Sequence, residues 1–136
     1  MSDGFPGSRE FPEGTRTAAD AAAAIGCEVS QIVKSLVFRR GSDVVLVLCS
    51  GANTVDTDKL GLEKADADLV RTVTGYAIGG VPPFDWRTPP SETLLDEDLM
   101  VHDVVWAAAG TPRSVFPLGP DALAERTEGR VTRVKP

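Results

Sequence analysis

The chain has 136 residues, which is enough for one domain and too few for two ordinary ones. Apolar residues make up 42% and charged residues 25%, a balance typical of globular proteins, so disorder throughout the chain is excluded. The 20 acidic residues outnumber the 14 basic ones and give a net charge of −6, which argues against a broad basic face that binds duplex DNA. A small local site for one end of a nucleic acid stays open.

Hydrophobic periodicity and turn residues predict short elements of both kinds along the chain. The first 11 residues are rich in Gly, Pro and charge, and we expect a poorly ordered tail there that includes a short strand over 9–11. Helices are predicted over residues 18–25, 28–33, 57–62, 66–74 and 121–126. Strands are predicted over residues 34–40, 44–49, 93–95, 101–109, 115–118 and 131–134.

Local chemistry supports several of these boundaries. Thr17, with Asp20 three residues later, is typical of a capping box, and Gly26 suits the end of the same helix. Residues 41–43 form a three-residue turn between two β-rich runs, which predicts a hairpin. Residues 76–90 are dominated by Gly and Pro and exclude a regular element. Strands cluster in hairpins with helices between them, which predicts an α+β fold with a mixed, mostly antiparallel sheet.

Two cysteines and one histidine limit the metal and covalent chemistry of the chain. Cys27 and Cys49 form no CxxC pair, and with a single histidine we predict no zinc site and no other metal site. Both cysteines are interpreted as free thiols in a reducing cytoplasm. His102 lies in a strand-like run and is interpreted as a strand histidine rather than as a catalytic one.

Neither a targeting segment nor a membrane span is predicted. The first residues contain no apolar h-region, and the longest apolar runs, 44–49 and 104–109, are far too short to cross a membrane. The sequence also contains neither a GxGxxG nor a GxxxxGKS/T fingerprint, so we expect no nucleotide cofactor and no other cofactor. These observations predict a cytoplasmic protein.

Two features suggest a binding site. Lys34 stands where a helix is predicted to end and an apolar strand to begin, so its ammonium could hold an anion such as a phosphate at the mouth of the sheet. The alternative is an exposed lysine at the start of a strand. In the segment 75–83, adjacent glycines let the main chain approach a ligand and can point N–H groups at an oxyanion. The alternative there is a tight turn packed by Tyr76 and Phe84.

Several segments, in this order and spacing, resemble the YbaK/EbsC family, which includes freestanding relatives of the bacterial prolyl-tRNA synthetase editing domain. The segments are residues 17–22, 31–38, 53–56, 74–83 and 106–112, with the strand 115–118. The resemblance runs from about Pro12 to Val134. It implies a single compact domain over residues 1–136, built on a mixed, partly barrel-like sheet with flanking short helices.

The resemblance also implies an enzyme: a trans-editing aminoacyl-tRNA deacylase that hydrolyses the ester of a mischarged amino acid on tRNA. Lys34 matches the signature lysine and would hold the phosphate or a ribose oxygen of the terminal adenosine. The family's GxxxP loop matches Gly79, Gly80, Val81, Pro82 and Pro83. The N–H groups of Gly79 and Gly80 would bind the ester carbonyl, and a substrate hydroxyl would assist the chemistry. Further substrate-binding candidates near the cleft are Ser35, Asn53 and Tyr76.

The amino acid that is removed stays open among alanine, cysteine and serine, with tRNA for proline as the default tRNA. Some family members carry a Ser and an Asp in the late strands, and residues 107–110 and 114–116 lack that pair here. The expected partners are the acceptor end of an aminoacyl-tRNA and, as an option, a prolyl-tRNA synthetase. A monomer and a weak homodimer are both compatible with the sequence. The alternative function is a non-catalytic module on the same fold that binds an aminoacyl-adenosine-like end or a synthetase.

Overall fold

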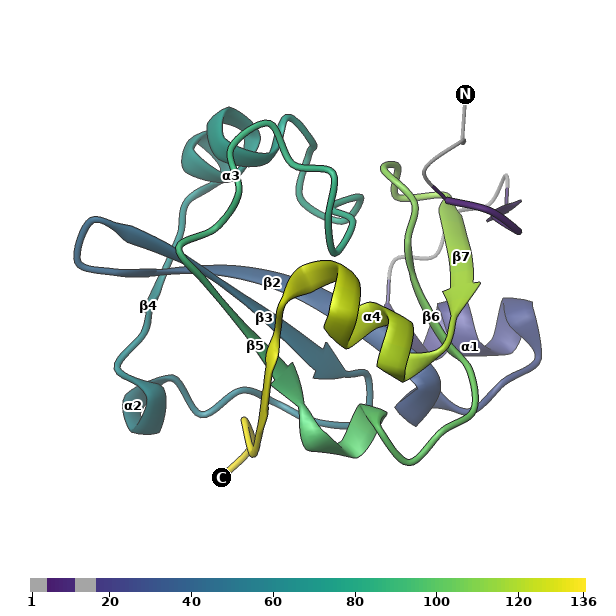
Figure 1. Ribbon diagram of the computed structural model, residues 1–136. Helices are drawn as coiled ribbons and strands as arrows, with labels where there is room; N and C mark the ends of the chain where they lie inside the picture. The colour runs from purple at the N-terminus through teal and green to yellow at the C-terminus, as the bar shows by residue number, and fades with distance from the viewer. Residues whose placement is uncertain (1–4, 12–16) are drawn as a thin grey trace.

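The computed structural model describes residues 5–11 and 17–136, and within them eight strands form one mixed sheet (Figure 1). The strand order is β1-β7-β6-β2-β3-β5-β8, and β4 pairs with β2 beside this path. The strands are β1 Arg9–Glu10, β2 Ile32–Arg40, β3 Asp43–Ser50, β4 Glu63–Lys64, β5 Glu92–Asp96, β6 Val105–Ala108, β7 Ser114–Leu118 and β8 Arg130–Thr132. The helices are α1 Ala18–Ile25, α2 Thr57–Leu60, α3 Ala67–Thr74 and α4 Pro120–Thr127, with 3₁₀ helices at Val29–Gln31 and Glu97–Leu99.

The antiparallel hairpin of β2 and β3 forms the centre of the sheet. Parallel pairs join β2 to β6, β3 to β5 and β5 to β8, so the predicted α+β fold with a mixed sheet is confirmed. The hairpin loop has two residues rather than the predicted three, because Asp43 already pairs with Arg40. Gly41 takes φ +64°, a conformation that favours glycine and closes this tight turn.

The apolar run of β3 is buried on both faces of the sheet. Leu46 and Leu48 belong to a cluster with Leu123 of α4, which crosses one face of the sheet (Figure 1). Val45 and Val47 belong to a second cluster on the opposite face. Successive side chains of a strand leave opposite faces, so an unbroken apolar sequence fits a strand that is covered on both sides.

Helix boundaries follow the capping chemistry of the sequence. The Thr17 hydroxyl accepts a hydrogen bond from the Asp20 N–H at 3.0 Å and starts α1. Asp56 and Asp66 cap α2 and α3 in the same way. The predicted helices over 18–25 and 66–74 are therefore confirmed, whereas α2 ends earlier than predicted because Gly61 adopts a left-handed conformation.

Two predicted elements are shorter in the structure. The helix expected over 28–33 is a single 3₁₀ turn, because Ile32 and Val33 already pair with β6. The strand expected over 101–109 is β6 alone, since residues 101–104 form a turn. His102 thus lies in this turn and not in a strand. None of the helices in the described part of the chain has the length and apolar character needed to cross a membrane.

The N-terminal segment is packed where the structure describes it. Phe5 is 7% exposed, and its ring lies 5.8 Å from the Phe84 ring and 4.9 Å from the Phe116 ring. Arg9 and Glu10 pair with β7. Residues 5–11 are therefore packed and do not form the poorly ordered tail predicted there, whereas the short strand predicted over 9–11 is confirmed as β1. Residues 1–4 and 12–16 lie outside the described part of the chain.

We expect Phe5→Ala to lower the free energy of unfolding by about 3 kcal/mol, because the change empties a buried aromatic position. Urea denaturation followed by circular dichroism measures the effect. Phe11→Ala is the matched control, because Phe11 is half-buried and should cost less. A smaller loss for Phe5→Ala than for Phe11→Ala would contradict the packing of this segment.

Candidate functional site

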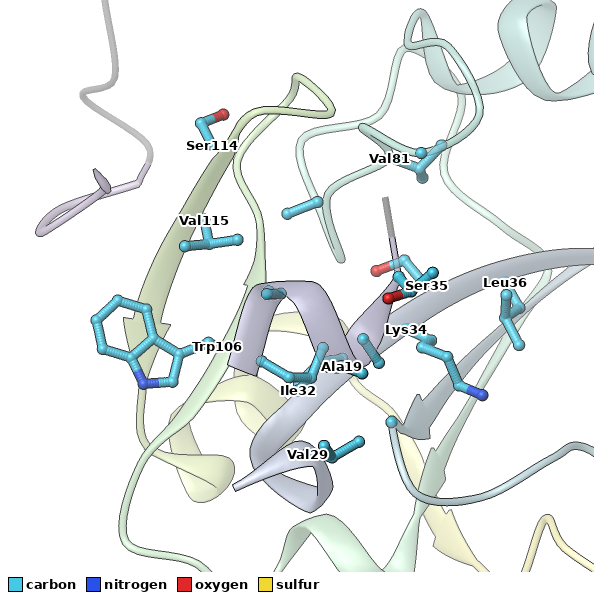
Figure 2. Close-up of a pocket in the computed structure, with 18 of the residues that line it drawn as sticks. Ala19, Val29, Ile32, Lys34, Ser35, Leu36, Val81, Trp106, Ser114 and Val115 are labelled. Carbon is cyan, nitrogen blue, oxygen red and sulfur yellow. The ribbon is translucent and has the colours of Figure 1, made fainter. Parts of the chain in front are cut away.

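A cavity of about 590 Å³ lies between α1, the start of β2, β6 and the loop at residues 78–81 (Figure 2). It exists because the outer edge of β2, the edge that faces away from β3, is incompletely paired. β6 pairs with this edge at Ile32 and Val33, and β4 pairs with it at Phe38 and Arg39. Between these contacts, residues 34–37 have no strand partner on that edge within the described structure.

The main chain of Ser35 faces this open edge. The Gly51 N–H donates to the Ile32 carbonyl at 2.7 Å, which directs the polar groups of even-numbered β2 residues toward β3. Because these groups alternate along a strand, the Ser35 N–H and C=O point to the opposite, unpaired edge. The Ser35 Oγ is also buried and has no hydrogen-bond partner among the described residues. Ser35 therefore offers three polar groups at the edge of the cavity.

Lys34 borders the cavity from the other face of the same strand. Its Nζ donates to the main-chain carbonyl of Asn53 at 2.5 Å, and the ion pairs of the described residues do not include it. An ammonium has three N–H donors, so this contact leaves donors and the whole positive charge for a ligand. The prediction of an exposed lysine at a strand start does not fit, since Lys34 is half-buried inside β2.

Cys49 pairs with Lys34 across the hairpin. Burial raises the pKa of the Cys49 thiol to about 12, although the nearby Lys34 charge opposes this shift. The thiolate is the nucleophilic form of cysteine, so Cys49 stays protonated and unreactive at neutral pH. Both cysteines are free thiols, as predicted.

The loop after α3 covers the cavity through Ile78, Gly79 and Val81. Gly79 has φ +96°, a conformation that favours glycine. The Gly80 N–H already has a partner, because it donates to the Ala77 carbonyl at 3.0 Å. A Cβ on Gly80 would lie 2.8 Å from the Thr111 main chain, so this glycine permits the close approach of two loops. Gly79, rather than Gly80, therefore has its N–H available to a ligand.

The other predicted site residues lie around the cavity without lining it. The Pro82 carbonyl accepts a hydrogen bond from the Trp86 indole at 2.7 Å, and Pro83 borders a separate cavity of about 310 Å³. The Tyr76 hydroxyl donates to the Asp85 carboxylate at 3.1 Å. The Asn53 side-chain amide donates hydrogen bonds to the carboxylates of Asp96 and Asp98. These contacts give Pro82, Tyr76 and Asn53 structural partners.

Sequence reasoning missed the apolar wall of the cavity. Figure 2 shows Trp106 and Val115 across the cavity from Ser35, with Val81 above them. Ala18 and Ala21 of α1 complete this wall. The alanine-rich helix was a visible signal, because small side chains leave space where a larger residue would fill it. Ile78, 60% exposed at the rim, carried no such signal.

Ionisable groups are scarce at this site. Among the described residues that line the cavity, Lys34 is the one ionisable side chain. His102 lies elsewhere, and its Nε2 is buried without a partner among the described residues. The described residues include no cluster of three or more His, Cys, Asp or Glu side chains that could hold a metal ion. The arrangement can bind an anion and hydrogen-bond a carbonyl, but the described residues that line it include no carboxylate or imidazole to act as a general base.

Comparisons with known proteins identify relatives. The family model of the aminoacyl-tRNA editing domain matches residues 12–125. The uncharacterized protein YwhH of Bacillus subtilis is 33% identical over 129 residues, which cover 90% of this chain and 82% of that protein. A proline–tRNA ligase of Pelotomaculum thermopropionicum is 31% identical over 83 residues, covering 56% of this chain and 14% of the ligase.

A solved structure agrees with these matches. The crystal structure of a proposed trans-editing enzyme for prolyl tRNA synthetase superposes with a TM-score of 0.88 at 46% identity. The match covers 95% of this chain and 85% of that one.

We expect Cys49 to make stability fall in alkaline solution. Burial raises the pKa of the folded thiol to about 12, whereas the unfolded thiol loses its proton near the ordinary cysteine pKa of 9.0. Above about pH 9 the folded state therefore binds more protons, and the free energy of unfolding should drop by about 1 kcal/mol at about pH 10. Urea denaturation at about pH 8 and about pH 10 measures this, with Cys49→Ala as the control. An equal pH-dependent loss in both proteins would rule out this assignment to Cys49.

Proposed function

The chain belongs to the aminoacyl-tRNA editing domain family, and from this premise we propose that it is an aminoacyl-tRNA deacylase that acts in trans. The observation that carries the proposal is that three features of the described structure meet around one cavity. They are the Lys34 ammonium, which forms no ion pair with a described residue, the edge of β2 at Ser35, which has no described strand partner, and the Gly79 loop. Its partner is the acceptor end of a mischarged tRNA, with tRNA for proline as the default. A prolyl-tRNA synthetase is an optional further partner.

Lys34 binds the anionic part of the substrate. A terminal adenosine brings a phosphate and ribose oxygens to the site, and a lysine offers them a compact positive charge. The protein carries a net charge of −6, so this local positive charge directs the tRNA end to one place on an otherwise acidic molecule. The half-buried setting of Lys34 strengthens the attraction, because screening by solvent is weaker there.

The main chain binds the ester. The Gly79 N–H donates to the carbonyl oxygen and stabilises the negative charge that develops when water attacks the carbon. The Ser35 N–H, C=O and Oγ form hydrogen bonds with the polar atoms of the substrate that lie beside the ester. Such preorganised groups can supply several kcal/mol of transition-state stabilisation without titrating themselves.

The substrate supplies the remaining chemistry. Water attacks the ester carbon, the bond to the ribose oxygen breaks, and the amino acid and the free ribose hydroxyl leave. Because the described residues that line the cavity include no general base, the vicinal hydroxyl of the same ribose orients the water and accepts or relays its proton. Correct placement then accounts for most of the rate.

The apolar wall receives the amino-acid side chain. Ala18, Ala21, Trp106 and Val115 present no charged group to it, and residues 107–110 and 114–116 lack the Ser and Asp pair that some family members carry. We therefore place alanine, cysteine and serine in the test panel without ranking them. Pockets separate such small side chains weakly, which is the reason that editing sites exist.

We expect Lys34→Ala to lower the hydrolysis of one mischarged tRNA by about tenfold or more, equivalent to about 1.4 kcal/mol of barrier. The assay follows release of the amino acid from tRNA for proline that carries Ala, Cys, Ser or Pro. Lys59→Ala is the matched control, because Lys59 is exposed and lies outside the cavity.

Hydrolysis by the wild type at the spontaneous rate for every panel member would overturn the deacylase proposal. Binding of the same tRNAs without hydrolysis would instead support a non-catalytic module that recognises the aminoacyl-adenosine end.

A further inference from the structure

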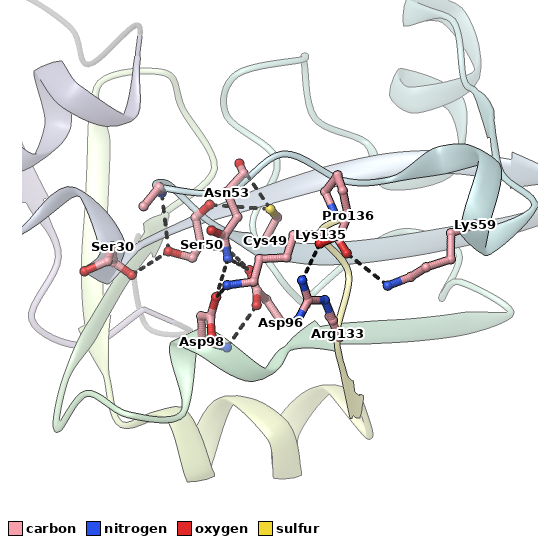
Figure 3. A network of polar contacts seen from close by, with 11 residues as sticks. Ser30, Cys49, Ser50, Asn53, Lys59, Asp96, Asp98, Arg133, Lys135 and Pro136 are labelled. Carbon is pink, nitrogen blue, oxygen red and sulfur yellow. Dashed lines mark hydrogen bonds and ion pairs between the residues drawn. The ribbon is translucent and has the colours of Figure 1, made fainter.

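A buried carboxylate lies next to the loop that contains Asn53, whose carbonyl accepts the hydrogen bond from Lys34 (Figure 3). Asp96, at the end of β5, is fully buried and accepts three hydrogen bonds at 2.9 Å each. The donors are the Ser50 N–H, the Asp98 N–H and the Asn53 side-chain amide. A buried carboxylate without such donors would be strongly unfavourable, so these contacts make the Asp96 side chain a fixed anchor.

Asn53 connects this anchor to the cavity. Its side-chain amide donates to Asp96 at 2.9 Å and to Asp98 at 2.8 Å, and its own N–H donates to the Ser50 carbonyl at 2.9 Å. Its main-chain carbonyl accepts the hydrogen bond from the Lys34 Nζ. The Asn53 side chain is therefore fixed on one side of the loop, while the Asn53 carbonyl accepts the hydrogen bond from Lys34.

The arrangement preserves the charge of Lys34 while restricting its motion. A lysine side chain loses rotamer freedom when it is fixed, so a flexible lysine binds a ligand less effectively than one already in place. A carboxylate in direct contact would also fix it, but would neutralise the charge that the ligand needs. The Asn53 carbonyl is neutral, so it fixes the ammonium without that loss. The Asn53 side chain is itself held by the buried Asp96 carboxylate.

The outer side of this network is closed by the C-terminal segment. The Lys135 Nζ donates to the Asp98 carboxylate at 2.7 Å, and the Asp56 N–H donates to the Val134 carbonyl at 2.8 Å. The contacts from Lys135 and Asn53 hold the pKa of the Asp98 carboxyl below its usual range. Asp98 thus stays ionised at neutral pH and remains an acceptor for Asn53.

We propose that Asn53, anchored by the buried carboxylate of Asp96, is the positioning residue that holds the Lys34 ammonium for the substrate. This inference rests on the proposed function of Lys34 and assigns Asn53 a role away from the substrate. It differs from the expectation that Asn53 contacts the substrate itself.

A double-mutant cycle tests the inference in the full chain. We expect Asn53→Ala to lower kcat/KM for the hydrolysed mischarged tRNA by about tenfold. In the Lys34→Ala background the same change should have almost no further effect, because Asn53 acts through Lys34. A residue that contacts the substrate, or one with a general structural role, would give additive losses, and additive losses overturn the proposal.

The control Lys135→Ala removes a charged side chain from the same network but leaves both side-chain contacts of Asn53 in place. It should keep kcat/KM within about twofold of the wild-type value. A loss equal to that of Asn53→Ala would show general loosening of the C-terminal segment and would also overturn the proposal. If Lys34→Ala itself has no effect, the proposed function fails first.

A measurement independent of activity tests the positioning directly. The ε-methylene signals of Lys34 in a proton–carbon NMR spectrum, assigned by their absence in Lys34→Ala, report whether the side chain is fixed. We expect two distinct proton shifts in the wild type and a single averaged shift in Asn53→Ala. Unchanged signals in Asn53→Ala would refute the positioning role, whatever the result of the deacylation assay.

Discussion

Polar main-chain groups of a strand normally have partners on both edges, and leaving them unpaired when buried costs free energy. β2 departs from this pattern at Ser35, because β6 diverges after Val33 and β4 begins to pair only at Phe38. The cavity occupies the space that a continuous neighbouring strand would fill, and the 78–81 loop and α1 enclose it. Within the described structure, the main-chain groups of Ser35 are therefore left without a strand partner beside the cavity.

The sequence predicted the parts of the fold that depend on local chemistry. The caps of α1 and α3 and the β2–β3 hairpin each follow from residues a few positions apart. Lys34 could be singled out because it precedes an apolar strand, and the resemblance to an editing family gave it a role. In contrast, the burial of Phe5 depends on Phe84 and Phe116, which no local pattern connects to it.

The predictions that failed did so because they, too, depend on contacts between residues far apart in the sequence. Residues 101–104 have a strand-like composition, yet the preceding 3₁₀ helix continues into a turn there, with the His102 N–H bonded to the Leu99 carbonyl. Asn53 lies in a segment that resembles the family, but the orientation of its side chain is set by a hydrogen bond to Asp96, which is distant in the sequence. Gly80 belongs to a glycine pair, but its N–H is already bonded within its own turn. Tertiary contacts, which periodicity cannot show, decide each of these cases.

The two walls of the cavity differ in the kind of atom that they present. On the β2 side and in the covering loop, the main-chain groups of Ser35 and Gly79 accompany the Lys34 side chain, and a change of side chain at position 35 leaves the main-chain groups there in place. On the α1 and β6 side, the surface consists of side chains such as Ala18 and Ala108. Evolution can therefore alter the second wall by single substitutions while the first stays intact. Under the proposed function, a substitution in the second wall would change the side chain that the cavity accepts and leave the main-chain groups of Ser35 and Gly79 in place.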